Sequence, residues 1–427
     1  MTEPPIVIEH REHVWYLLVQ ASQLEHMIMC QYLFAEFSLK TDGLTEEQQA
    51  AVDRWRQELH GIAVQEMLHL ALVANLMSSI GAAPTFGRPN FPQSSGAFPP
   101  SIQLRLLPFG EAALAHFLYL ERPEGMDRHD AAEFISCDPP PEPVATGEIF
   151  PRAQEFATVG HLYRGIKDGL TALVAKYGEE QVFCGSPRAQ ATPELFRWPE
   201  MVAVTDLASA CAAIEEIIEQ GEGAQGAWQD AHYGRFLKIW EEYHALRAAD
   251  PAFEPAHPAL GAFTRQPFDV REPQPLIGDP RTLALAELCN LAYEAILWLL
   301  TRYFTHTDES EEELDVLISA AITTMAAVLR PLGTELCRRP AGPAHPGRTA
   351  GPAFEMYYLM DNVVPWREAA WTVLVERLRQ IAERCASHAA ADPVIAQASE
   401  QVTAVADALD AVRAKAASGI TTPGGTA

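Results

Sequence analysis

The stretch from Gln23 to Ser38 reads QLEHMIMCQYLFAEFS and carries a glutamate, Glu25, on an apolar helical face. The residues three, four and seven positions from Glu25 are Leu18, Ala21, Ile28 and Tyr32. A carboxylate buried among such side chains either takes up a proton or needs a compensating cation, and a metal ion is the simplest one. The alternative is a carboxylate that reaches solvent or pairs with the adjacent His26.

A second stretch begins at Glu66 and reads EMLHLALVANLMSSIGAAP. Its E-x-x-H spacing places Glu66 and His69 on one helix face, where they can share a metal ion. With 57 acidic residues and 14 histidines, about two such pairs are expected by chance. Glu241/His244 and Glu254/His257 have the same spacing. The first pair is preferred because it lies on an inward stripe with Ile62, Val73 and Leu76. For His69 alone, the alternative is an ordinary core histidine.

Helical periodicity predicts long helices at about 9–39, 45–80, 155–177 and 205–221, with a further helix at about 228–247. Between residues 81 and 154 lies a Pro- and Gly-rich connection with one short helix near 111–121. Two helices, a long crossover and two more helices are typical of a ferritin-like four-helix bundle. The predicted fold class is therefore all-α.

Two further residues are predicted ligands from the end of this bundle. His232 lies on an aromatic stripe, but its partner position is Gln229, so the second E-x-x-H pair is incomplete. Glu222 is the preferred substitute, because flanking glycines permit unusual backbone angles and a close approach. Glu219 and Glu215 are less favoured, and the alternative for Glu222 is a solvated acid beside a glycine helix end.

The third bundle helix should supply a glutamate, yet its inward candidate is His161. Small residues surround it at Ala157, Gly165 and Ala172, which lets helices approach closely. With His161 as a ligand, three carboxylates would face two divalent cations. The centre would then be positive and would favour an anionic ligand.

The second half of the chain predicts helices at about 281–305, 311–338, 365–388 and 393–416. A Pro-rich linker precedes them, so we expect a metal-binding bundle at 1–275, a C-terminal helical domain at 276–417 and a frayed tail at 418–427. Aromatic residues of the crossover could roof a substrate pocket, although simple packing is favoured. They are Phe86, Phe91, Phe98 and Tyr119.

Composition excludes some partners. The net charge of −26 disfavours nucleic acid and anionic membranes, which require clustered basic residues. No stretch has the pattern of a signal peptide, and the longest apolar run is interrupted by Glu294, so no membrane span is expected. The seven cysteines are scattered without a C-x-x-C pair, which fits a reducing cytoplasm.

Several segments together resemble the iminophenyl-pyruvate dimer synthase family. They are the two stretches quoted above, TVGHLYRGI (158–166), EQGEG (219–223), AHYGRFLKIW (231–240), GRTAGPAFE (347–355) and ERLRQIAERC (376–385). The resemblance implies a ferritin-like domain with a helical extension and carries metal positions over to Glu25, Glu66, His69, Glu222 and His232, with His161 where many relatives have glutamate. Enzymes of this family, which are much longer, couple two arylpyruvate imines oxidatively. Some relatives bind haem; this chain has no C-x-x-C-H motif for covalent attachment, and the sequence leaves noncovalent haem open.

The leading functional hypothesis is a redox enzyme with a dinuclear iron centre, or manganese as the alternative, that uses dioxygen or peroxide to oxidise a small organic substrate, aromatic or anionic. Glu66 would bridge the metals. The alternatives are oxidative coupling of arylpyruvate imines and a non-catalytic metal-binding or structural bundle. The sequence leaves the oligomeric state open, a homo-oligomer included.

Overall fold

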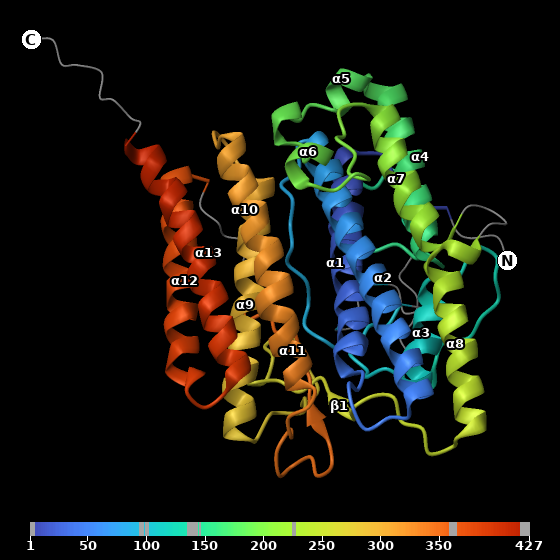
Figure 1. Cartoon of the computed structure of the whole chain (residues 1–427). Helices are drawn as coiled ribbons and strands as arrows, with labels where there is room; N and C mark the ends of the chain where they lie inside the picture. The colour runs from blue at the N-terminus through green and yellow to red at the C-terminus, as the bar shows by residue number, and fades with distance from the viewer. Residues whose placement is uncertain are drawn as a thin grey trace, which may run out of the picture.

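Two long antiparallel helices, α1 (Arg11–Ser38) and α2 (Glu46–Ser79), lie side by side at the centre of the fold (Figure 1). Helix α2 begins with a capping box, in which Thr45 and Gln48 each bond the backbone N–H of the other. Nearly all of α1 after its second turn is buried, because other elements cover it on all sides. This explains why its sequence is apolar around most of its circumference.

The computed structural model describes residues 5–93, 98, 102–134, 144, 147–223, 228–357 and 365–418. Of the predicted tail, residues 419–427 lie outside the described residues, as does Cys137.

Four shorter helices complete the bundle beside this central pair. Helix α4 (Val159–Tyr177) packs against α7 (Leu207–Gly221), and α3 (Glu111–Leu120) packs against α8 (His232–Ala249). Figure 1 shows the first pair beside the upper half of α1 and α2 and the second pair beside the lower half. The middle of the bundle is therefore where several helices begin or end.

The predicted helix at 228–247 starts later than expected. Trp228–Asp230 form a 3₁₀ turn, and α8 begins at His232. A Cβ atom on Gly234 would lie 2.3 Å from the carbonyl oxygen of Gln229, so this glycine lets the turn fold tightly onto the helix. His232 is thereby placed at a helix start instead of within a helix.

Short helices connect the main ones. They are a 3₁₀ turn at Ala132–Phe134, α5 (Glu179–Val182), a 3₁₀ turn at Pro187–Ala189 and α6 (Pro193–Phe196). Two strands of two residues, β1 (Ala259–Leu260) and β2 (Thr349–Ala350), pair in parallel and join the linker to the second half.

The second half consists of α9 (Pro280–Phe304), α10 (Glu311–Thr324), α11 (Arg330–Leu336), α12 (Arg367–Ala389) and α13 (Pro393–Ser418). Helices α12 and α13 pair and pack on α9 and α10, while α11 contacts α1. The all-α ferritin-like fold with a further helical part is therefore confirmed. The position of the domain boundary stays a prediction.

The helix predicted at 311–338 is interrupted by a π-helical segment, Met325–Leu329. Pro331 lies two residues after this segment, and its ring nitrogen cannot donate to the carbonyl of Ala327 as an α-helix requires. The chain widens its helical turn before this proline and continues as α11.

Three helical stretches are long and apolar enough to cross a membrane, judged by length and composition alone. They are Glu46–Ser79, Pro280–Phe304 and Glu311–Leu336. The fold buries 78% of the most apolar window of the first and 50% of that of the third, so packing accounts for the first more fully. The expectation of no membrane span stays a prediction.

Candidate metal centre

Glu25, Glu66 and His69 meet between α1 and α2 as the stripe analysis predicted. The Nδ1 atom of His69 lies 2.8 Å from Oε2 of Glu66 and 3.5 Å from Oε2 of Glu25. All three side chains are buried, and one atom from each lies within 4.8 Å of the others. This is one of two groups of potential metal ligands in the part of the chain that the structure describes.

The second group shares Glu66 and adds His232 and Glu121. The Nδ1 atom of His232 lies 3.0 Å from Oε1 of Glu66 and 3.7 Å from Oε1 of Glu121. The two oxygens of Glu66 therefore face two different imidazoles, whose ring centroids are 5.6 Å apart. A carboxylate placed in this way can bridge two cations.

Glu121 was not among the predicted ligands. It is the residue that ends α3, the short helix within the crossover. A detectable signal existed, because Leu114, Phe117 and Leu118 precede it at spacings of seven, four and three, the same criterion that selected Glu25. The sequence pattern predicts the crossover to be mainly a connection, so the residues of its short helix were not among the candidate ligands.

Glu222 lies at the end of α7 and lines the same small cavity as Glu25 and Glu66. Its Oε1 accepts a hydrogen bond from the backbone N–H of Gly160 at 2.9 Å, and its Oε2 lies 3.3 Å from the Arg164 guanidinium. Gly160 makes this approach possible, because a Cβ atom there would lie 2.4 Å from Oε2. Glu222 is not a member of either ligand group among the described residues.

His161 is in the first turn of α4 and is buried, but it too is absent from both groups among the residues described. Its Nδ1 accepts a hydrogen bond from the backbone N–H of Ala157 at 3.1 Å. Whether His161 and Glu222 bind metal stays a prediction.

Two buried tyrosines hold the terminal carboxylates. The Tyr163 hydroxyl donates to Oε1 of Glu25 at 2.6 Å, and the Tyr32 hydroxyl donates to Oε1 of Glu121. At Glu25 the tyrosine holds Oε1 while Oε2 faces His69, whereas at Glu121 the tyrosine holds Oε1, the oxygen that also lies nearest His232. Such outer contacts orient the ligands of a metal site.

The buried charges shift one another's protonation. Burial raises the pKa of Glu25 to about 7, an effect that the charge of Glu66 increases. Burial would also raise the pKa of Glu66, but the positive charges of His69 and His232 outweigh it and hold this pKa well below its ordinary value. Burial opposes the charged forms of His69 and His232, yet the neighbouring carboxylates raise both pKa values.

The donor set fits a metal ion, and the surroundings of the His232 imidazole support this fit. Its Nδ1 is fully buried and, within the described residues, has no hydrogen-bond partner of acceptable geometry, although Oε1 of Glu66 is only 3.0 Å away. A buried nitrogen without a partner is costly. A cation between this nitrogen and the carboxylates would satisfy it, and mixed oxygen and nitrogen donors suit iron or manganese.

The cavity at the centre is small, with space of about 10 Å³. None of the four crossover aromatics lines it, and the aromatic residue that does among the described residues is Tyr163 of α4. Phe86 and Phe91 are buried in packing contacts, and Tyr119 lies against Arg122. Only a molecule of a few atoms fits beside the carboxylates in this conformation.

A bundle in which carboxylates and imidazoles from separate helices converge on one buried point defines the ferritin-like class of helical proteins. The chain belongs to the ferritin-like family, whose model matches residues 18–241. That match includes every predicted ligand and Glu121.

Two curated relatives extend the similarity beyond the bundle. The chain is 26% identical over 399 residues to dichlorochromopyrrolate synthase of Lentzea aerocolonigenes and 29% identical over 372 residues to 2-imino-3-(indol-3-yl)propanoate dimerase of Chromobacterium violaceum. These alignments cover 84% and 82% of this chain but 37% and 34% of the relatives. The resemblance to the imine dimer synthase family is thus confirmed, and the chain spans about a third of their length.

Among solved structures, the fold is similar to the crystal structure of a ferritin-like protein from Caulobacter vibrioides. The TM-score is 0.51 with 17% sequence identity, and the match covers 82% of this chain and 100% of the other. At this level of identity the similarity supports the fold only.

Proposed function

We propose that the chain is a metal-dependent oxidoreductase with a dinuclear centre of iron, or of manganese as the alternative, that uses dioxygen or peroxide to oxidise a small organic molecule. The observation that supports this most is the pair of ligand groups that share Glu66, with one imidazole on each of its oxygens. When bound, the metals would supply the redox chemistry that these side chains cannot provide.

The protein's own residues would set the net charge of this centre and the positions of its ligands. Glu66 would bridge, Glu25 and Glu121 would be terminal, and His69 and His232 would supply one nitrogen each. Three carboxylates against two divalent cations leave one positive charge, which favours an anionic partner. Tyr163 and Tyr32 hold the terminal carboxylates, and the apolar packing of α1 and α2 excludes bulk water.

A second candidate is oxidative coupling of arylpyruvate imines. It is favoured by the names of both curated relatives, which describe synthesis of a chromopyrrolate and dimerisation of an indolyl imine. Because the chain spans only about a third of their length, this activity is proposed for it together with any partner that supplies the remaining steps.

The ligand assignment is tested by elemental analysis of purified variants. We expect Glu66→Ala to lose most bound metal, because Glu66 is common to both groups, and His232→Ala to lose roughly one of two ions. Glu241→Ala is the matched control, since this exposed glutamate has the same spacing to a histidine and lies in neither group. Unchanged metal content in both ligand variants would refute the assignment.

Dioxygen consumption separates the enzymatic proposals from metal storage. A metal-loaded oxidoreductase consumes dioxygen, or added peroxide, in proportion to the product formed, and the coupling candidate does so with arylpyruvate imines. A storage or structural bundle would show no turnover with any of these substrates. That result would exclude both enzymatic proposals, but it would not affect the ligand assignment.

A further inference from the structure

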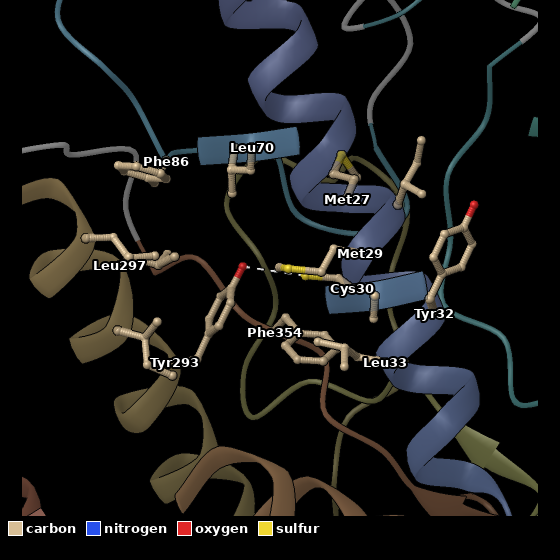
Figure 2. Packing of buried hydrophobic residues seen from close by; sticks show 14 of the residues in the cluster. Met27, Met29, Cys30, Tyr32, Leu33, Leu70, Phe86, Tyr293, Leu297 and Phe354 are labelled. Atoms are coloured by element: carbon tan, nitrogen blue, oxygen red, sulfur yellow. Dashed lines mark hydrogen bonds between the residues drawn. The ribbon is translucent and has the colours of Figure 1, made fainter. Parts of the chain in front are cut away.

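A second and much larger cavity lies between the bundle and the C-terminal helices. Its volume is about 310 Å³, within the range of small-molecule sites. Helices α1 and α2 form one wall, while α9, α10 and the π-helical segment form the other. Figure 2 shows Tyr293 and Leu297 of α9 facing Met29 and Leu33 of α1, with Phe86 and Phe354 beside them.

This cavity is separate from the metal centre, because the two share no lining residue and use different side chains of the same helices. On α1, His26 and Met29 line the large cavity, whereas Glu25 lines the small one. In Figure 2, Tyr32, which contacts the metal centre through Glu121, points away from the side of α1 that carries Met29. A ligand in the large cavity would therefore not touch the metal centre.

The lining favours flat aromatic molecules. Aromatic side chains come from both halves of the chain, and methionines from α1, α2 and the π-helical segment add polarisable sulfur. The aromatic residues are Phe37, Phe86, Phe196, Trp198, Tyr293, Phe304 and Phe354. Protein interiors are normally filled, so a void of this size among large side chains indicates space kept for a ligand.

The polar groups in the cavity wall are already paired. The Arg88 Nε donates to the Tyr293 hydroxyl at 3.0 Å, this hydroxyl lies 2.6 Å from Nε2 of His26, and Nδ1 of His26 lies 2.9 Å from the Phe86 carbonyl. His26 is therefore a neutral imidazole that donates to the carbonyl and accepts from the tyrosine. These bonds occupy the polar atoms of His26 and Tyr293, the two members of this chain that line the cavity.

The charges near the mouth are also paired. The Glu36 carboxylate accepts from Arg330 at 2.6 Å and lies 3.3 Å from Nδ1 of His60. Because the acid offsets the arginine, the entrance does not select an anion.

The π-helical segment, which precedes Pro331, also borders the cavity. Its residues Met325, Ala326 and Leu329 line the cavity, and Ile322, just before it, is 39% exposed. Segments of π-helix occur frequently at functional sites. Here the segment forms the rim through which a molecule would enter.

We propose that the cavity between α1, α2, α9 and the π-helical segment binds an uncharged aromatic small molecule at a site distinct from the metal centre. This proposal is independent of the proposed function, because it requires neither metal nor turnover.

Titration of the full-length protein with the uncharged fluorescent probe N-phenyl-1-naphthylamine tests it. We expect saturable binding of one probe per chain. Ala71→Trp from α2 and Leu297→Trp from α9 fill the cavity from opposite walls and should each weaken binding at least tenfold. Ala408→Trp, on the exposed face of α13, is the matched control and should bind as the wild type does. Thermal melting and metal content identify the variants that remain folded.

Competition distinguishes the chemical classes. We expect 1-naphthol to displace the probe at least tenfold more effectively than 1-decanol or 1-naphthoate. Equal displacement by decanol would indicate an aliphatic site, and equal displacement by naphthoate would indicate a site for anions; either result overturns the proposal. Unchanged binding by a folded cavity-filling variant also overturns it. An anomalous peak for 1-iodonaphthalene in the cavity of wild-type crystals supports it without any variant, and a peak elsewhere alone contradicts it.

Discussion

The carboxylate of Glu66 lies between the imidazoles of His69 and His232, and each outer acid of the centre is held by a tyrosine. At the scale of the residue, the charges of these side chains compensate one another only in part when no metal is bound. The pKa of Glu25 shows this most clearly, because burial raises it in the absence of a cation.

Metal-free protein should lose stability through Glu25 as the pH rises. A carboxyl whose pKa is raised on folding from 4.5 to about 7 stabilises the fold below pH 4.5, and this contribution is lost as the pH rises through 7. The expected loss is on the order of 3 kcal/mol. Urea unfolding of the metal-free wild type and of Glu25→Gln, at pH 4.5 and 7.5, measures it. Parallel pH dependence of the two proteins would contradict this expectation.

Glu121 should be required for full metal loading although the sequence patterns did not select it. We expect Glu121→Ala to lose roughly one ion of two, because this variant removes the terminal carboxylate of the group that contains His232. Elemental analysis measures the loss, with Glu124→Ala as a nearby control on the same connection. Metal content equal to that of the wild type would show that Glu121 is not a ligand.

At the scale of the element, a buried ion pair fixes the turn between α9 and α10. Arg302 is fully buried near the end of α9, and its guanidinium donates to Glu309, to the Pro365 carbonyl at 3.1 Å and to the Thr307 hydroxyl at 3.2 Å. Trp371 of α12 donates to the same glutamate at 3.1 Å. One carboxylate in the turn before α10 thus connects α9 with α12.

Replacing Glu309 with alanine should destabilise the protein by about 3–5 kcal/mol, because Arg302 would remain buried without a counter-charge. Chemical unfolding measures the effect. The control is Glu312→Ala, which breaks an exposed pair with Lys415 and should cost less than about 1 kcal/mol. Equal effects of the two variants would show that burial does not decide the strength of this pair.

At the scale of the whole molecule, the C-terminal helices cover the face of α1 and α2 that is turned away from the metal centre. Met29, Leu33 and Phe37 on that face are buried and line the cavity between the two halves. Without the second half this apolar face would be exposed to solvent, and exposed apolar surface promotes aggregation.

Truncation after residue 275 should therefore give a poorly soluble protein. Sedimentation and size-exclusion chromatography of fragment 1–275 against the full chain measure this. A soluble fragment that retains its full metal content would show that the bundle is independent of the second half.

Periodicity in the sequence was sufficient for the helices and for four residues of the centre. Glu25, Glu66, His69 and His232 stand on apolar stripes, and a stripe is a local property of a helix that must bury one face. The acidic and apolar composition likewise requires no knowledge of the fold.

Only the tertiary structure decided how separate segments meet. Glu121 reaches the centre because α3 packs on α8, the placement of Glu222 depends on contacts with Gly160 and Arg164, and the aromatic cavity exists because two halves of the chain face each other. The physical reason is that spacing along a helix fixes which side chains share a face, whereas the meeting of faces distant in sequence is set by packing of the whole core.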